Sequence, residues 1–461
     1  MGPRKRERVA LAACMFLTTA CIGFVQPFLP PYLKASGLSD GQIGIVVGLG
    51  TGASLIIQPI LGRLSDAWDA RRPLMATAAA LGGLAFFAFR FVPPGLGALA
   101  ATVAFTLLVA VGTNAITYLS AAGGVLVGRL VGSERGAAAY AGYRVWGSIG
   151  FIVISVVTGL LLGQQAGGAA AQDRASLSSV FLWGPLLFLA NAAVALFVPD
   201  RKKAPVAPSG RVAPPAPNSG GAGVPRDGGP GAAPSPSDTN LLAPPELGAG
   251  GACPAATLRP FLVAFFLYQF AMGGMLAFLS LHLRALGAAP GFIPFVWAVG
   301  VVFEVLMMTR IGRWSDRWGR RPALAVAVLA LPVRLLLLAV APGPLFVLGV
   351  QALEGLNFGI IGPISIAYVN DLATDKNRGA AQARLAGVSG LAFALGPVVA
   401  GLVAGAAGYR LAFVALASVA VAGAVLFVRT VGESHPAAQP LDTRGPEFLR
   451  PLLRLLAAPP G

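Results

Sequence analysis

Long apolar runs separated by short polar segments make up most of this chain. Each run has about 20 residues, which is the length an α-helix needs to cross a ~30 Å hydrocarbon core. The pattern therefore predicts an all-α integral membrane protein with twelve transmembrane helices in two sets of six. The expected spans are residues 9–32, 41–62, 74–92, 96–120, 137–162 and 176–198, followed by 259–284, 291–312, 322–341, 343–369, 381–406 and 408–430.

Composition agrees with a lipid environment. The chain has 461 residues, of which 56% are hydrophobic and only 11% are charged, whereas soluble domains have about 25% charged residues. The net charge of +16 does not indicate nucleic-acid binding, because the basic residues fall in short loops and form no continuous stripe. We therefore expect the lipid bilayer, and no nucleic acid, as a partner.

A polar segment divides the two sets of helices. We expect residues 1–199 to form an N-terminal six-helix bundle and residues 257–430 a C-terminal one, followed by a cytoplasmic tail at 431–461. Residues 200–256 are rich in Pro, Gly, Ala and Ser and have few aromatic residues. Such a segment buries too little apolar surface to offset its chain entropy, which predicts a disordered cytoplasmic linker.

The basic residues predict the orientation. With a cytoplasmic N-terminus, 27 of the 34 Lys and Arg residues lie in or beside cytoplasmic segments. Five face the opposite side, namely Lys34, Arg90, Arg174, Arg284 and Arg410. Because cytoplasmic loops carry the excess of Lys and Arg, we expect both termini in the cytoplasm and the chain in the inner (plasma) membrane.

The two halves repeat each other. The segment GRLSDAWDARRP, which begins at Gly62, returns as GRWSDRWGRRP from Gly312, in each case after the second helix of its half. ERGAA from Glu134 returns as NRGAA from Asn377, in each case before the fifth helix. Parallel repeats of this kind predict a binding site between two bundles and a rocking movement of one bundle against the other.

With these repeats the chain resembles the major facilitator superfamily, over all of its length outside the linker and tails. In that family the loop G-x-x-x-D-[RK]-x-G-R-[RK] is the main signature, and the resemblance implies alternating access with this loop as a cytoplasmic gate motif. The second copy is complete in Gly312, Asp316, Arg317, Gly319, Arg320 and Arg321. The first copy keeps Gly62, Asp66, Arg71 and Arg72 but has Ala67, Asp69 and Ala70 at the other signature positions.

Four ionisable residues lie deep within predicted spans, and such residues tend to face a cavity or a partner because exposure to lipid is costly. At ~1.5 Å per residue, Arg334 lies roughly 12 Å and Glu354 roughly 15 Å from the outer, non-cytoplasmic ends of their helices. This similar depth predicts an ion pair. One interpretation is a purely stabilising pair; the other is a proton site at Glu354 whose proton affinity depends on whether Arg334 or water adjoins it.

The other two deep residues are Glu304 and Arg144. Glu304 is either a residue that reaches the membrane interface or a substrate or proton ligand paired across the cavity with Arg144. The guanidinium of Arg144 offers five donors to a carboxylate or polyol. Further substrate-binding candidates are Asn114, Tyr118 and Gln269, while Gln26, Gln58, Tyr268 and Asn357 face either a cavity or a neighbouring helix.

This placement of charges resembles the branch that contains lactose permease and the phenylpropionate-type permeases. The resemblance implies that Arg144 and Glu304 contact substrate, and that Arg334 and Glu354 serve proton coupling. Gln351 stands where that branch would have a His, three residues before Glu354. Because the eleventh helix also lacks a buried Lys and the fourth lacks a Glu, a galactoside-like sugar is disfavoured.

Other classes of chemistry find no support. The three Cys and two His residues show no metal-ligand or disulfide spacing, and neither a catalytic triad nor a phosphate-binding loop is present. We therefore expect no enzyme activity, no cofactor and no metal. The predicted function is proton-coupled uptake of a small polar or anionic organic solute by a monomer. The alternatives are a proton-driven drug efflux antiporter and a transporter-like receptor.

Overall fold

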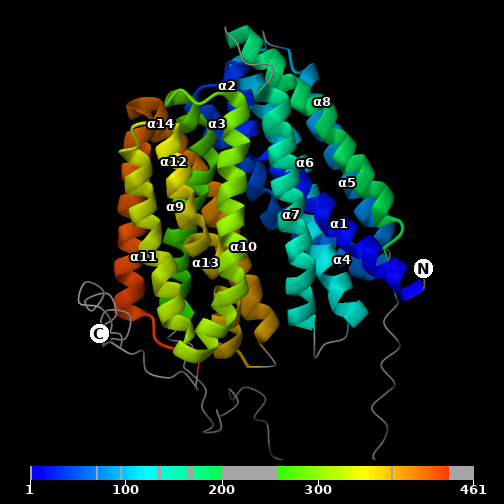
Figure 1. Ribbon diagram of the computed structural model, residues 1–461, viewed down its shortest axis with the longest axis vertical. Coiled ribbons are helices and arrows are strands. Elements are labelled where there is room, and N and C mark those ends of the chain that lie inside the picture. Colours follow the sequence, from blue (N-terminus) through cyan, green and yellow to red (C-terminus); the bar gives the residue numbers. More distant parts are fainter. Residues whose placement is uncertain are drawn as a thin grey trace, which may run out of the picture. The chain divides into compact units, whose positions relative to one another are not determined.

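The computed structural model describes residues 3–68, 71–93, 96–131, 136–163, 170–198, 258–374 and 377–435 of the chain. The predicted linker at 200–256 and most of the predicted tail lie outside these residues. Within the described part all regular structure is helical. Figure 1 shows the helices of the first half in blue to green and those of the second half in green to orange.

The first half contains eight α-helices and one short 3-10 turn among the described residues. They are α1 (Pro3–Val25), α2 (Leu29–Ala35), α3 (Asp40–Gly52), α4 (Ser54–Trp68), α5 (Arg71–Ala88), η1 (Phe89–Phe91), α6 (Ala98–Val131), α7 (Gly136–Gly163) and α8 (Ala170–Ala195).

The second half contains six α-helices and two short 3-10 turns among the described residues. They are α9 (Leu258–Ala285), η3 (Pro290–Phe292), α10 (Ile293–Trp318), α11 (Arg320–Ala339), α12 (Pro344–Val350), η4 (Gln351–Leu353), α13 (Glu354–Leu372) and α14 (Arg378–Thr430).

The predicted number of spans is confirmed. Eleven stretches of the described residues are long and apolar enough to cross a membrane. The last of them, Arg378–Thr430, has 53 residues and is two helices that meet at a kink. At this kink Gly408 has a φ of 84°, a left-handed conformation that favours glycine. Counting these two helices separately gives twelve spans, six in each half, and agrees with the predicted break between 406 and 408.

Three spans that the sequence pattern presented as continuous are interrupted. The first span breaks between α1 and α2 around Pro27, and the second breaks between α3 and α4 at Ala53. The tenth contains the 3-10 turn Gln351–Leu353. Proline removes a backbone donor and clashes with the preceding turn, which accounts for the first break. Hydropathy does not register these interruptions because the residues around them are still apolar.

A cluster of aromatic rings forms much of the core of the first half. The rings of Phe89 and Phe181 stack with their centroids 5.1 Å apart, and Tyr32 donates a hydrogen bond from its hydroxyl to the Phe89 carbonyl at 3.0 Å. These contacts tie α2, η1 and α8 together. These rings belong to a core cluster that continues into residues of the second half.

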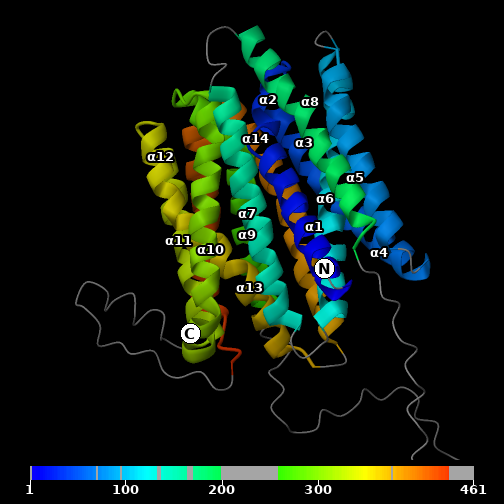
Figure 2. The ribbon, with the colours of Figure 1, turned by 45° about the vertical axis from the view of Figure 1, so that its right-hand side comes forward.

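The two halves meet closely where α3 lies beside α14 and where α7 lies beside η3 and α10 (Figures 1 and 2). At Gly44 a Cβ atom would collide with the carbonyl oxygen of Pro397, and at Gly159 it would lie 2.8 Å from the carbonyl oxygen of Gly291. Only glycine permits this approach of backbones.

A polar contact reinforces the same end of the helices, where α2 ends and α3 begins, which we term the α2–α3 end. Asp40 accepts a hydrogen bond from the Tyr409 hydroxyl of the other half at 2.9 Å. Lys34 forms an ion pair with the second oxygen of the same carboxylate, also at 2.9 Å. The halves are thus held together at the α2–α3 end by both packing and hydrogen bonding.

The repeated turns lie at the opposite end of the helices. Asp66 forms an ion pair with Arg71 in the first copy, and Asp316 forms one with Arg320 at 2.6 Å in the second. In the second copy Glu433 also accepts hydrogen bonds from the backbone N–H of Arg320 at 2.8 Å and of the next residue at 3.0 Å. Each of these contacts stays within one half, so they fix the shape of a turn and do not join the bundles.

Candidate functional site

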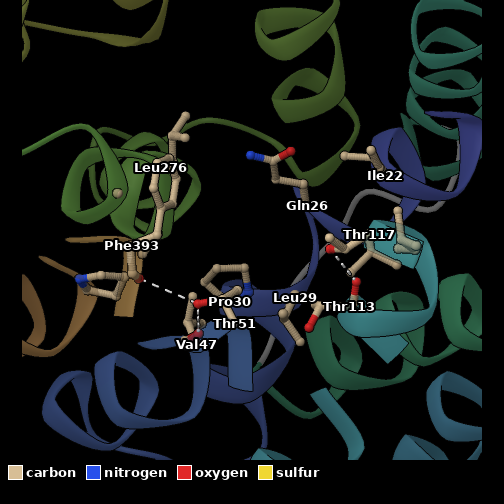
Figure 3. Close-up of a pocket in the computed structure, with 15 residues that line it drawn as sticks. Ile22, Gln26, Leu29, Pro30, Val47, Thr51, Thr113, Thr117, Leu276 and Phe393 are labelled. Carbon is tan, nitrogen blue, oxygen red and sulfur yellow. Dashed lines mark hydrogen bonds between the residues drawn. The ribbon is translucent and has the colours of Figure 1, made fainter. Parts of the chain in front are cut away.

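Two adjoining pockets lie between the halves and share four lining residues. The first has a volume of about 250 Å³ and a mostly apolar wall. Its labelled residues come from both halves, as Figure 3 shows, with Leu276 and Phe393 facing side chains of α1, α2, α3 and α6. The residues common to both pockets are Ile22, Gln26, Leu276 and Phe393.

The second pocket is more polar and has a volume of about 240 Å³. Three of the four deep ionisable residues line it: Arg144 from α7, Glu304 from α10 and Glu354 from α13. Hydroxyl groups from the first half add hydrogen-bonding capacity, as do Gln26 and Trp297. The remaining lining residues are Thr19, Ile22, Ser148, Phe151, Leu276, Val301, Phe358 and Phe393.

Arg144 and Glu304 form an ion pair across the two halves. The guanidinium Nη2 donates a hydrogen bond to Oε1 of Glu304 at 3.3 Å. The arginine side chain is 37% exposed and the glutamate side chain 11% exposed. The pairing predicted from the sequence is therefore formed, and the arginine side chain remains partly exposed.

Arg334 and Glu354 form the second predicted ion pair, entirely within the second half. Nη1 of Arg334 contacts Oε2 of Glu354, and the side chains are 0% and 8% exposed. Arg334 also donates from Nη2 to the amide oxygen of Gln351 at 2.8 Å. Gln351 in turn donates to the carbonyl oxygen of Val296 at 3.2 Å, which ties the cluster to α10.

Gln351 lies at the interruption of the tenth span. It begins the 3-10 turn η4, and Glu354 begins α13 immediately after it. The Gln351 amide and the Glu354 carboxylate contact the same guanidinium, that of Arg334. Gln351, which stands where the lactose permease branch would have a His, thus takes part in the buried cluster through its own hydrogen bonds.

Three predicted substrate-binding residues do not line either pocket. Asn114 is 2% exposed and is held by Gln58, which donates to its amide oxygen at 3.1 Å. Tyr118 is buried in a core cluster of the first half. Gln269 donates to the Ser389 hydroxyl at 2.9 Å, within the second half. Their predicted role in binding substrate stays a prediction, and their geometry gives it no support.

Other polar residues do line the apolar pocket. Thr113 and Thr117 project from one face of α6 toward it, and Thr51 projects from α3 (Figure 3). Thr51 is within 3.4 Å of the Phe393 carbonyl oxygen in the other half. The signal in the sequence was the spacing of four between the α6 threonines, which places both on one side of a helix.

The described residues contain no group of three or more His, Cys, Asp or Glu side chains that could hold a metal ion. The chemistry available in the pockets is therefore that of carboxylates, a guanidinium, amides and hydroxyls. Groups of these types can form hydrogen bonds and ion pairs with a polar solute.

Comparison with known proteins identifies the family. The model described as "MFS_1 like family" matches residues 8–415. The chain belongs to the major facilitator superfamily. It is accordingly a multi-pass membrane transporter and not an enzyme.

Curated relatives fall in the same superfamily. An uncharacterized MFS-type transporter of Mycobacterium tuberculosis is 30% identical over 179 residues, which are 38% of this chain and 42% of that protein. The alignment thus spans less than half of the mycobacterial relative. The multi-drug resistance efflux pump PmrA of Streptococcus pneumoniae is 27% identical over 428 residues, which cover 89% of this chain and 92% of the pump.

Solved structures share the fold at low sequence identity. The nucleoside transporter NupG superposes with a TM-score of 0.64 at 17% identity, covering 93% of this chain and 98% of NupG. The D-xylose-proton symporter superposes with a TM-score of 0.65 at 14% identity, covering 94% of this chain and 98% of that protein. At this identity the likeness establishes the twelve-helix fold.

Proposed function

We propose that this transporter couples the uptake of a small polar or anionic organic solute to protons. The observation that carries the proposal is the ion pair between Arg144 and Glu304, which joins the two halves inside a pocket that Glu354 also lines. Ionisable groups are costly within a membrane span and mark substrate or proton pathways. Here the carboxylates and the guanidinium converge on one cavity.

The mechanism follows from where each pair lies. When one bundle rocks against the other, the distance between Arg144 and Glu304 changes, whereas Arg334 and Glu354 move together. A solute carboxylate or hydroxyl that binds the guanidinium of Arg144 competes with Glu304 for it. A Glu304 that loses its cationic partner gains affinity for a proton. Binding of an anionic solute and binding of a proton would then favour each other.

The proposed orientation places the α2–α3 end outside the cell. The excess of Lys and Arg in the opposite segments supports this assignment, because such residues mark cytoplasmic loops. On this assignment, the packing of Gly44 against Pro397 and the bond between Asp40 and Tyr409 close the outer side. The pockets would then be closed to the outside of the cell in this state.

The experiment is a transport assay with purified protein in proteoliposomes that contain a pH-sensitive dye. Organic anions and polyols are added one at a time, and a transported solute should acidify the lumen when the outside is acidic. Glu354→Gln should abolish accumulation driven by the proton gradient but spare exchange of labelled for unlabelled solute. Glu7→Gln, which removes a carboxylate far from the pockets, serves as the control.

Two outcomes would contradict the proposal. Loss of both accumulation and exchange in Glu354→Gln, with the control intact, would assign the residue a structural role. If no solute in the panel shows exchange although it binds, the protein acts as a receptor and does not transport.

Proton-driven efflux is the second candidate, and the relation to PmrA supports it because that alignment covers 89% of this chain and 92% of the pump. The mostly apolar wall of the first pocket also suits an apolar compound. The same proteoliposomes separate the two functions. An inward proton gradient should drive solute into the lumen during symport, and should expel a preloaded compound such as ethidium during antiport.

A further inference from the structure

A third pocket lies near the second copy of the repeated turn, away from the central cavity. It has a volume of about 210 Å³ and an almost entirely apolar wall. Its lining comes from α10, α11 and α13, and consists of Met307, Ile311, Trp314, Trp318, Gly319, Pro322, Ala323, Val326, Leu356 and Ile360. We term this pocket the α10–α11 groove.

The groove faces away from the transport pathway. On α13, Glu354 and Phe358 line the polar central pocket, whereas Leu356 and Ile360 line the groove. At about 100° per residue, Leu356 projects from roughly the opposite side of the helix to Glu354. The groove therefore opens on the outer side of the bundle, where a spanning helix meets hydrocarbon.

Two tryptophans mark the level of the membrane interface beside the groove. Trp314 and Trp318 are 44% and 37% exposed, and their ring centroids lie 5.8 Å apart. Trp318 is the last residue of its membrane span, Pro290–Trp318. Tryptophan is enriched at this level, where its ring adjoins both lipid headgroups and acyl chains.

Exposed arginines flank the same side of α10. Arg310 lies four residues before Trp314 and Arg317 three residues after it, so all three share a helix side, and all three are exposed. The neighbouring Asp316 is paired with Arg320. The rim of the groove is thus cationic beside an apolar pocket.

The internal repeat shows that the fold does not require this arrangement. Arg310 and Trp314 correspond to Ile60 and Leu64 in the first copy, and neither position belongs to the signature of the turn. Arg313, by contrast, corresponds to Arg63 and is basic in both copies. The cation and the indole beside the groove are particular to the second half and need a local explanation.

We infer that the α10–α11 groove binds an anionic glycerophospholipid, with an acyl chain in the apolar pocket and the phosphate at Arg310 and Arg317. Arginine forms short, charge-assisted hydrogen bonds with phosphate oxygens. Basic pockets between membrane helices are known to select anionic headgroups. The chemistry selects a lipid with a net negative headgroup over a zwitterionic one.

Tryptophan quenching by brominated lipid tests this assignment. The full chain is placed in nanodiscs of phosphatidylglycerol and phosphatidylcholine at fixed ratio, with bromine on the acyl chains of one lipid or the other. The signal of Trp314 is the difference between the protein and its Trp314→Phe variant. Phosphatidylglycerol should occupy the groove beyond its mole fraction, with a preference of roughly 30-fold for two basic residues near the surface.

Matched variants locate the preference. Arg310→Gln with Arg317→Gln should return the Trp314 signal to the mole-fraction ratio, whereas Arg63→Gln in the first repeat should leave the preference intact. Trp183, which is 62% exposed on α8, should report the mole-fraction ratio throughout. The inference is overturned if Trp314 also follows the mole fraction in the unaltered protein, if neither lipid quenches it, or if Arg63→Gln reduces the preference equally.

Discussion

Removal of one member of the buried pair Arg334–Glu354 should destabilise the protein more than removal of both. Neither side chain has more than 8% of its surface exposed. Breaking a buried pair by deleting one partner costs about 3–5 kcal/mol, because the other charge is left uncompensated. We therefore expect Glu354→Met to lower the free energy of unfolding by about that amount.

Gln351, the third member of the cluster, determines the expected stabilities of Arg334→Met and of the double variant. Arg334→Met leaves Glu354 unpaired and also deprives Gln351 of a 2.8 Å hydrogen bond. An orphaned buried acceptor costs about 1–3 kcal/mol, so Arg334→Met should be the least stable variant. The double variant has no uncompensated charge and retains only the loss at Gln351. It should be more stable than either single variant.

Equilibrium unfolding in mixed detergent micelles, followed by helical circular dichroism, measures these differences. The pair Lys34–Asp40 at the α2–α3 end provides a control, since a lysine that is 43% exposed is screened by solvent and its pair is worth at most about 1 kcal/mol. The reasoning is refuted if the double variant Arg334→Met/Glu354→Met loses the sum of the two single losses, or if the control pair behaves like the buried one.

Three further predictions concern binding and the contact between the halves. Arg144→Lys keeps the charge but loses the planar fork of donors. Solute affinity measured by calorimetry should therefore fall roughly tenfold, which is about 1.4 kcal/mol. An unchanged affinity would exclude this residue from binding. Gly44→Val should separate the halves at the α2–α3 end, seen as longer spin-label distances, whereas Gly349→Val, which meets open space, should not. Tyr409→Phe removes the hydrogen bond to Asp40 and should shift the closed population about fivefold, for roughly 1 kcal/mol; identical distance distributions would rule out a latch.

The spans and the repeat could be predicted from sequence because lipid imposes them. A helix that crosses hydrocarbon must be apolar throughout, so each span leaves a clear record in hydropathy. The interruptions leave none. Ala53 and the turn at Gln351–Leu353 are as compatible with a continuous apolar helix as with a break, since the neighbouring helices decide where the backbone deviates.

Both ion pairs could be predicted because so few charges lie within the spans. Depth along the helix was enough to match Arg334 with Glu354, and no other cation was available for Glu304. It was harder to predict which uncharged polar residues line a pocket, because this depends on how each helix is rotated about its own axis. Thr113 lines the apolar pocket, while the adjacent Asn114, turned by about 100°, hydrogen-bonds within its own half.

The deep charged residues of the second half have no charged equivalents in the first half. With the offset of the repeated turn, Glu304 corresponds to Ser54; the first copy of the turn has one extra residue, so Arg334 corresponds to Ala85. A six-helix half therefore forms without charge at these positions, and the second half carries charges that the fold of a half does not need. Arg144 is the ionisable group through which the first half reaches them. If the halves rock as proposed, the surroundings of Glu304 change while Arg334 keeps Glu354 in place, and both carboxylates line the same pocket.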